Sequence, residues 1–483
     1  MEVAERLPSP AASRWGGETL RRHAGLVAVV GLAALVRLAT EVAYRPALFF
    51  DDSWTYVVYA YDRALNRFPG DRPAGYPLFL NAADAFGRSI TSVVTLQHLA
   101  GLATGVLVYF LLLRLGTRRR WATLGAAIVL LDGYAIALEQ YVMPEALFTL
   151  ALTVSVFLVT VARPTPASLA ASGFLLAASI SLRTMGLFAV PVWLAYLALK
   201  RVPRRSFAAG AAALLIPLLA YASAQASAGE GFSVVPPGNG WFLYGRIGPI
   251  ADCRGIDVPA SERPLCVDSR TRERHTRPDF YVWKAGSPAN RAFGYVNRDP
   301  VHLEGPNRTI RSFALRIARH RPLAYGSATA LDFARFFAPE VASERPDDGP
   351  IRLPVDLQHR FPGFHAQARF FPDYDPRAHP PAALVRSYRG VVHTPRWLMA
   401  LFALAGLALL PVGRRNRGRA VLPRRREALF LTGTALVMLL GAAATTNFNV
   451  RYVVALVPLF TAGGVLAIED LWALPAARER RIV

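Results

Sequence analysis

The chain has 483 residues, of which 53% are hydrophobic and only 18% are charged, and its formal net charge is +22. Soluble chains carry about a quarter charged residues, so this composition, with its long apolar runs, excludes an ordinary soluble protein and indicates a membrane protein. The basic residues lie mostly in short clusters between the apolar runs, as the positive-inside rule requires, so the net charge does not indicate a nucleic-acid partner.

The apolar runs predict an all-α polytopic fold with about ten membrane helices. A helix needs about 20 apolar residues to cross a bilayer, and several runs are shorter than that. The fifth and sixth runs could instead form one broken helix, which would invert the topology after it. The predicted helices cover roughly residues 24–43, 91–113, 121–138, 146–162, 168–182, 184–199, 206–224, 397–412, 427–444 and 452–470.

Clusters of basic residues test this count. If the N-terminus is cytoplasmic, every short cluster falls on the cytoplasmic side, so we expect a multi-pass cell-membrane protein with both termini inside. The first apolar run is expected to be a retained span and not a cleaved signal. The clusters are Arg14, Arg21 and Arg22; Arg118, Arg119 and Arg120; Lys200, Arg201, Arg204 and Arg205; Arg414, Arg415, Arg417, Arg419, Arg424, Arg425 and Arg426; and Arg478, Arg480 and Arg481.

Two polar segments are then extracytoplasmic. One is the first outer loop, 44–90, and the other is the long loop 225–396, which is large enough for a small folded domain of mixed structure. Cys253 and Cys266 lie close together in the long loop, where an oxidising compartment predicts a disulfide; two unpaired thiols are the alternative. The expected division is a cytoplasmic tail 1–23, a transmembrane core 24–224, the loop domain 225–396, C-terminal membrane helices 397–470 and a cytoplasmic tail 471–483.

The first outer loop contains two adjacent carboxylates, Asp51 and Asp52, between an apolar segment and a stretch rich in Trp and Tyr. This position at the bilayer surface lets a carboxylate stay ionised beside a lipid substrate. Such a group suits a general base for an acceptor hydroxyl, or a metal ligand. A helix N-cap explains an aspartate here equally well.

The same loop continues with a turn that begins at Arg72 and contains two prolines, a glycine and Tyr76. A rigid turn bearing an arginine can hold a phosphate. Prolines also occur at plain junctions between a loop and a helix, which is the alternative interpretation.

Other charged residues mark the outer ends of later helices. Glu139 and Glu145 flank the connection between the third and fourth helices, Arg183 follows the fifth, and Arg451 precedes the last. Each one alone is explained by anchoring at the membrane boundary. Together they place acids and arginines at one membrane level, where charges usually mark a site. Carboxylates and arginines together suit a base that acts beside a phosphate leaving group.

The pattern resembles the C-type (GT-C) glycosyltransferases, polytopic enzymes that use a polyprenyl-phosphate-linked sugar and include protein O-mannosyltransferases and the aminoarabinose transferase of lipid A. The resemblance rests on Asp-Asp-Ser-x-x-Tyr, Arg-Pro-x-Gly-Tyr-Pro, Met-Pro-Glu, Leu-Arg-Thr and a late Arg-Tyr, in that order. It covers roughly residues 24–200 well and the C-terminal third only in topology. The loop 225–396 matches no accessory domain of the family.

The resemblance implies that Asp52 or Asp51 is the catalytic base, and Tyr56, at the spacing associated with the family's acid, favours Asp52. Glu145 would lie across the site and help to bind the acceptor or a metal. Some relatives need a divalent metal and others do not, so a metal ion held by Asp52 and Glu145 stays open.

The resemblance also implies that Arg183 and Arg451 neutralise the carrier phosphate, while Arg72 and Tyr76 shape its entry. The expected reaction is an inverting hexosyl or pentosyl transfer from a polyprenyl-phosphate-sugar to a hydroxyl of a glycan, lipid or protein acceptor, outside the cytoplasm. A transporter or flippase for a lipid-linked substrate is one alternative, which would need a second site on the cytoplasmic side. An O-antigen-type glycan polymerase or ligase is another, which would place its key charges in the long loop.

Overall fold

The computed structural model describes residues 21–62, 68–87, 89–160, 164–295, 303–339, 351–355, 370–371, 374, 378–415 and 424–479, without the side chains of 411–415 and 473–479. Every regular element in these residues is a helix, and the one β-type contact is an isolated parallel bridge between Leu48 and Tyr141. The predicted all-α fold is therefore confirmed. The mixed structure expected for the long loop is not seen in its described residues, which are helical where they are regular.

The helices of the bundle match the predicted apolar runs one by one. Two runs each contain a pair of helices: α6 and α7, which are bent by 43°, and α22 and α23. The bundle contains α2 (Ala24–Ala43), α5 (Ile90–Arg114), α6 (Arg119–Leu130), α7 (Gly133–Gln140), α8 (Glu145–Thr160), α9 (Pro166–Leu182), η2 (Thr184–Phe188), α10 (Ala189–Lys200), α11 (Arg204–Ser227), α20 (Arg396–Arg415), α21 (Arg425–Thr445), α22 (Val450–Val454) and α23 (Val457–Glu479).

Fewer helices than ten are long enough to cross a membrane. Within the described residues, five helical segments meet the requirements of length and apolar composition, or six if the bent α6–α7 pair is one span. Helix α8 is apolar but has 16 residues, which gives a length of about 24 Å against a hydrocarbon core of about 30 Å. The chain is thus a multi-pass membrane protein, and the predicted count of ten spans is not confirmed.

The fifth and sixth predicted runs are two separate elements and not one broken helix. Arg183 interrupts them with an extended backbone (φ −146°, ψ 125°). The Nζ atom of Lys200, at the end of α10, donates a hydrogen bond to the carbonyl oxygen of Val159, near the end of α8 (2.7 Å). Because α9 starts just after Val159, α10 must run back towards the level at which α9 begins.

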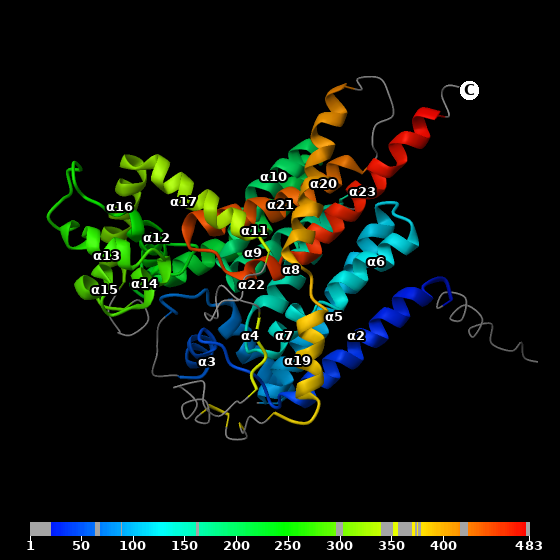
Figure 1. Cartoon of the computed structure of the whole chain (residues 1–483), viewed down its shortest axis with the longest axis horizontal. Helices are drawn as coiled ribbons and strands as arrows, with labels where there is room; N and C mark the ends of the chain where they lie inside the picture. The colour runs from blue at the N-terminus through cyan, green and yellow to red at the C-terminus, as the bar shows by residue number, and fades with distance from the viewer. Residues whose placement is uncertain are drawn as a thin grey trace, which may run out of the picture.

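The basic clusters meet at one end of the bundle, at the right of Figure 1. Arg119 donates to the carbonyl oxygen of Arg22 (3.3 Å), and Arg424 donates to that of Gly116 (3.2 Å). Lys200 and Arg426 both lie over the ring of Tyr196. That this end is cytoplasmic stays a prediction. Of the predicted members, Arg14, Arg417, Arg419, Arg480 and Arg481 lie outside the described residues, as do the side chains of Arg414, Arg415 and Arg478.

The other end of the bundle carries the short helices of the 44–90 loop, α3 (Ser53–Tyr61), α4 (Gly75–Ala83) and η1 (Asp84–Phe86). This loop is joined to the connection between α7 and α8 by two backbone hydrogen bonds. Leu48 N donates to Gln140 O (3.0 Å), and Val142 N donates to Leu48 O (2.9 Å). The pairing brings the segment before Asp51 beside the segment before Glu145.

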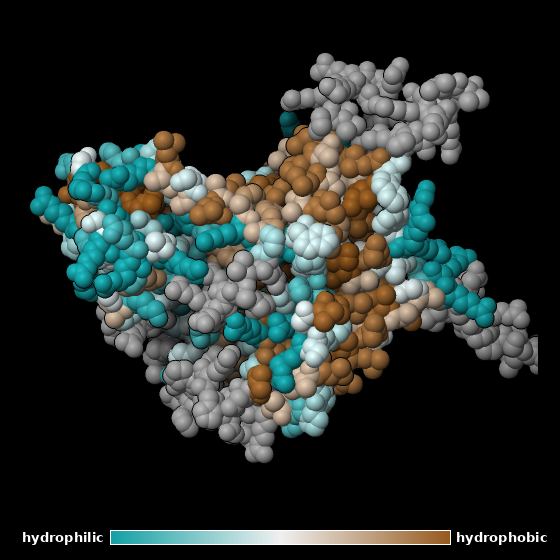
Figure 2. All heavy atoms as spheres, viewed as in Figure 1, coloured by the Kyte–Doolittle hydropathy of each residue, from teal (hydrophilic) through white to brown (hydrophobic). Residues whose placement is uncertain are grey.

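A second group of helices, here called the peripheral helices, extends to the left of the bundle in Figure 1. Their buried residues, including Trp241, Tyr244 and Phe313, form a hydrophobic cluster of their own. Figure 2 shows hydrophilic residues over this group and a hydrophobic band over the bundle. The group contains α12 (Asn239–Ile247), η3 (Gly248–Ile250), η4 (Arg263–Leu265), α13 (Ser269–Arg274), α14 (Pro278–Trp283), α15 (Pro288–Phe293), α16 (Glu304–His320) and α17 (Pro322–Arg335). Helix α19 (Ala382–Val391), which follows in the chain, packs on α2 and α7 of the bundle.

Candidate active site

Asp52 occupies the N-cap position of α3, but its side chain makes no capping hydrogen bond. Its carboxylate instead forms ion pairs with two arginines that are distant in sequence. One oxygen accepts from Arg72, and the other accepts from Arg451 Nη1 at 2.9 Å. Burial opposes the charge of Asp52, but the two arginines outweigh it, so the pKa of this carboxyl lies below its usual range. Asp52 is therefore ionised at neutral pH.

Glu145, the first residue of α8, extends this pair into a chain of alternating charges. Its Oε1 atom accepts from Arg183 and lies 3.6 Å from Arg451 Nη1. The order in space is Arg72, Asp52, Arg451, Glu145 and Arg183. The structure thus brings together five predicted site residues from four separate segments, and each carboxylate contacts an arginine on both sides.

Two of these arginines also stack on aromatic rings of the bundle. The guanidinium of Arg451 lies 4.4 Å from the ring centroid of Phe50, and that of Arg183 lies 5.2 Å from the ring centroid of Tyr452. Arg451 is held further by Asn449, whose Oδ1 atom accepts from its backbone nitrogen (3.0 Å) and from Nε (3.3 Å). These contacts fix the guanidinium groups before any ligand arrives.

Arg72 is held by the peripheral helices. Its guanidinium lies 5.6 Å from the ring centroid of Phe242, on α12, and 5.3 Å from that of Trp283, on α14. Neither aromatic residue was predicted, because the sequence of the long loop shows no periodicity that would direct particular residues to the site. The peripheral helices therefore contribute directly to the charged centre.

Tyr56 and Tyr76 are both buried, with ring centroids 5.0 Å apart in an edge-to-face contact, and burial raises the pKa of both phenols. Tyr56 lines the cavity described below. Tyr76 donates to the side chain of Gln97, which in turn donates to the backbone oxygens of Glu139 (2.7 Å) and Tyr141 (2.8 Å). The structure therefore places Tyr76 among the groups that support the site, away from the lining residues.

The sequence interpretation missed Asp71, which precedes Arg72. Only 2% of its side chain is exposed, and Oδ2 lies 3.6 Å from Arg72 Nη1. Its other oxygen is buried and has no hydrogen-bond partner among the described residues. Burial raises the pKa of Asp71, although Arg72 opposes this. Asp51, by contrast, is exposed.

A cavity of about 1550 Å³ joins these groups. One side, here called the bundle wall, contains Asp51, Asp52, Asp71, Arg72, Arg183 and Arg451. The other part of the lining, here called the peripheral wall, comes from residues of the long loop and contains Arg274, Arg277, Asp279, Lys284 and Arg311. Sites for one small molecule measure about 300–1,000 Å³, so this cavity has room for two substrates.

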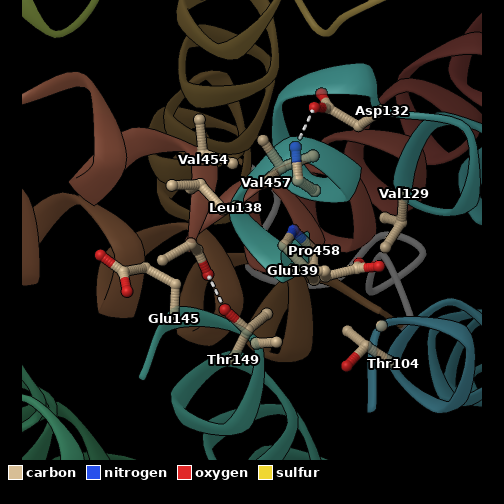
Figure 3. A pocket seen from close by; sticks show the side chains of 14 residues that line it. Thr104, Val129, Asp132, Leu138, Glu139, Glu145, Thr149, Val454, Val457 and Pro458 are labelled. Atoms are coloured by element: carbon tan, nitrogen blue, oxygen red, sulfur yellow. Dashed lines mark hydrogen bonds between the residues drawn. The ribbon is translucent and has the colours of Figure 1, made fainter. Parts of the chain in front are cut away.

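Glu145 does not line this large cavity. It borders a separate small cavity of about 40 Å³, together with Glu139, Asp132 and Thr149 (Figure 3). In that view the carboxylates of Glu139 and Glu145 point away from each other. Glu145 therefore contacts the arginines from behind, and the role across the site that the resemblance implies for it stays a prediction.

The residues present do not fit a metal site. The described part of the chain contains no group of three or more histidine, cysteine or acidic side chains that could hold a metal ion. Asp52 and Glu145, the two predicted ligands, are both paired with arginines.

Hydrogen bonds attach the peripheral helices and their flanking segments around the cavity. Gly238 N donates to Gly70 O (2.8 Å), Asn447 Nδ2 to Asp279 Oδ1 (2.9 Å), and Tyr325 OH to Ala444 O (2.8 Å). Within this group Cys253 is disulfide-bonded to Cys266, beside the hydrophobic cluster. The peripheral wall is thus held in a fixed position relative to the charged centre.

Residues 58–200 match the family model of the dolichyl-phosphate-mannose-protein mannosyltransferases. This stretch includes Arg72, Glu145 and Arg183 but starts after Asp52. No curated protein matches the chain. Similar solved structures include ArnT from Cupriavidus metallidurans, in the apo state (15% identity, TM-score 0.36, covering 90% of this chain and 78% of that one) and bound to undecaprenyl phosphate (13%, 0.36, 90% and 77%).

A third is the oligosaccharyltransferase AglB from Archaeoglobus fulgidus, in complex with an inhibitory peptide and a dolichol-phosphate (11% identity, TM-score 0.39, covering 96% of this chain and 52% of that one). This chain spans about half the length of the archaeal protein. The match to the family model supports the resemblance that was predicted from the sequence. The chain is a multi-pass membrane protein whose residues 58–200 are similar to the dolichyl-phosphate-mannose-protein mannosyltransferases, one of the groups of enzymes that the predicted resemblance includes.

Proposed function

We propose that this protein is an inverting glycosyltransferase that moves a sugar from a polyprenyl-phosphate-linked donor to an acceptor hydroxyl at the extracytoplasmic face, with Asp52 as general base. The observation that carries the proposal is the alternating chain of arginines and carboxylates, which crosses the wall of a cavity large enough for two substrates. The match to a family whose description names dolichyl-phosphate-mannose supports this class of donor.

The donor phosphodiester would compete with Asp52 for its two arginines. A guanidinium binds phosphate through paired hydrogen bonds, so Arg72 and Arg451 are suited to exchange a carboxylate for the donor phosphate. As an arginine turns to the phosphate, Asp52 loses the charge that depresses its pKa and becomes a stronger base. Binding of the donor would thereby prepare the base for the reaction.

The chemical step forms one bond at the anomeric carbon and breaks another. The acceptor oxygen attacks the anomeric carbon and passes its proton to Asp52, while the bond from that carbon to the phosphate oxygen breaks. The carrier phosphate leaves with the bonding electrons and gains one negative charge, which Arg72 and Arg451 stabilise. Attack from the face opposite the phosphate inverts the configuration. Glu145, behind the arginines, keeps Arg183 and Arg451 in place.

Replacement of the base tests the mechanism. Asp52→Asn keeps the size of the side chain, and we expect transfer from polyprenyl-phosphate sugars to fall about 10²- to 10⁴-fold, the usual contribution of a general base. The matched control is Asp51→Asn, which removes the charge of the adjacent, exposed carboxylate. Both variants should insert into the membrane. Near-normal turnover in both would refute the assignment of the base.

The assay must also separate the transferase from a flippase. Purified protein in proteoliposomes receives a panel of labelled polyprenyl-phosphate sugars, and released carrier phosphate and new glycosidic bonds are both measured. Movement of labelled lipid across the bilayer without a new glycosidic bond would support the transporter instead.

A further inference from the structure

The two walls of the large cavity differ in their charge balance. On the bundle wall, three carboxylates face three guanidinium groups, so the formal charges cancel. Within this set, Asp52 pairs with Arg72 and Arg451, and Asp71 lies beside Arg72. The residues concerned are Asp51, Asp52 and Asp71 against Arg72, Arg183 and Arg451.

The peripheral wall carries an excess of positive charge. Its described lining residues include four cations, Arg274, Arg277, Lys284 and Arg311, and one anion, Asp279, which leaves three formal positive charges. In the part of the chain that the structure describes, Arg274, Lys284 and Arg311 form no ion pair or hydrogen bond through their side chains, and all three are exposed. One oxygen of Asp279 already accepts from Asn447.

A donor with a phosphodiester cannot account for this excess, because it brings only one negative charge and belongs beside the arginines of the bundle wall. The excess also lies close to the centre. Trp283 contacts the guanidinium of Arg72 (5.3 Å), and Lys284 is the next residue along the chain. An anion held by Lys284 would therefore lie near the groups that surround Asp52.

We propose that the peripheral wall binds the acceptor and that the acceptor is anionic, with a phosphate or carboxylate close to the hydroxyl that receives the sugar. This inference rests on the proposed function, since it names the class of the second substrate. Arg274, Lys284 and Arg311 hold the anionic group through charge-assisted hydrogen bonds. The aromatic rings of Phe242 and Trp283, which contact Arg72, line the same cavity.

A set of charge-matched variants tests the wall. One triple variant, Arg274→Gln, Lys284→Gln and Arg311→Gln, removes the three cations. The control, Arg270→Gln, Arg291→Gln and Arg319→Gln, removes the same charge from exposed arginines of the peripheral helices that do not line the cavity. The probe is glucose 6-phosphate, with neutral glucose and inorganic phosphate as comparisons, and binding to the purified full chain is followed by saturation-transfer NMR.

We expect glucose 6-phosphate to bind more tightly than glucose, with affinity lowered about tenfold or more in the cavity variant, since loss of charge-assisted hydrogen bonds worth 1.4 kcal/mol is tenfold. The control should stay within about twofold, because exposed charges far from a ligand are screened. Displacement by inorganic phosphate would show that the anionic group is what the wall recognises. Equal losses in the two triple variants, or equal binding of glucose and its phosphate, would overturn the proposal.

Donor consumption separates this inference from the proposed function. A wild-type chain that binds glucose 6-phosphate through the peripheral wall but consumes no polyprenyl-phosphate sugar would contradict the glycosyltransferase and leave the anion site standing. The other outcome has three parts: the wild type consumes the donor, Asp52→Asn abolishes this consumption, and the cavity variant binds glucose 6-phosphate as tightly as the wild type. That outcome would refute only the anionic acceptor and would leave the glycosyltransferase standing.

Discussion

The two walls of the cavity hold their arginines in two different states. On the bundle wall, Arg451 is buried and contacts both Asp52 and Glu145. On the peripheral wall, Arg274 and Lys284 are exposed. A buried, paired charged side chain is held rigidly, and moving it costs free energy. An exposed charged side chain can change its conformation at little cost in free energy and so can bind a ligand. The arginines of the bundle wall are therefore positioned before a ligand binds, whereas the cations of the peripheral wall can reorient when one binds.

The largest expected effect tests this contrast directly. Arg451→Met should lower the free energy of unfolding by about 1.5–3 kcal/mol, because it removes a charge-assisted hydrogen bond to Asp52 and one of the two arginines beside Glu145, while Arg72 and Arg183 remain. Arg274→Met should change it by less than about 0.5 kcal/mol, as is usual for an exposed position. Denaturant unfolding of both variants in the same detergent measures the difference. Similar losses in the two would show that the walls are not distinct.

The next prediction concerns the group behind the arginines. Glu145→Gln removes a charge that contacts Arg183 and Arg451 but does not line the large cavity. Misplacement of the guanidinium groups should reduce kcat by up to about 100-fold. Glu145→Asp should recover part of kcat, because it restores the charge. If KM alone rose, Glu145 would be a group that contacts the substrate.

A smaller effect is expected where the two walls meet. Trp283→Ala removes a ring over Arg72, a cation–π contact worth about 0.5–2 kcal/mol, so turnover should fall by about 2- to 30-fold. Trp397, which is exposed, provides the control Trp397→Ala, and its turnover should stay near that of the wild type. Equal turnover in the two variants would argue against a role for the peripheral helices in holding Arg72.

The smallest effect follows from the opposite pKa shifts of two aspartates. Because Asp52 has a lowered pKa in the folded state, its charge stabilises the fold above the unfolded-state pKa of about 3.9. This stabilisation is lost as the pH falls through the folded-state pKa. The raised pKa of Asp71 has the reverse sign: its stabilising effect is present below the unfolded-state pKa and is lost as the pH rises through the folded-state value. Asp71→Asn should therefore be more stable than the wild type at pH 7, and the gap should close below about pH 4.

The bundle could be predicted well from sequence because its signals are local. The apolar runs predicted the helices of the bundle. Charged residues at the predicted helix ends indicated that Asp52, Glu145, Arg183 and Arg451 lie at one level of the membrane. The number of membrane spans could not be obtained in this way, because helices such as α8 are apolar but short. The position of Glu145 behind the arginines depends on the rotation of α8 about its axis, which the sequence pattern does not specify.

The peripheral helices show where such reasoning stops. Phe242 and Trp283 contact Arg72 across more than 150 residues of sequence, and no local pattern distinguishes them from the other aromatic residues of the long loop. Asp71 was missed for a different reason. An aspartate beside an arginine in a loop usually forms a solvated pair, and only the fold shows that this one is buried.

The short backbone pairing between Leu48 and the α7–α8 connection has a mechanical consequence. Helices that cross a bilayer tilt to match its thickness, and this tilt would ordinarily move the end of α2 relative to the start of α8. Two backbone hydrogen bonds tie these ends together directly beside Asp51 and Glu145. The spacing of the carboxylates is therefore set by the peptide backbone and not by the lipid. Turnover should accordingly depend little on the acyl-chain length of the surrounding membrane.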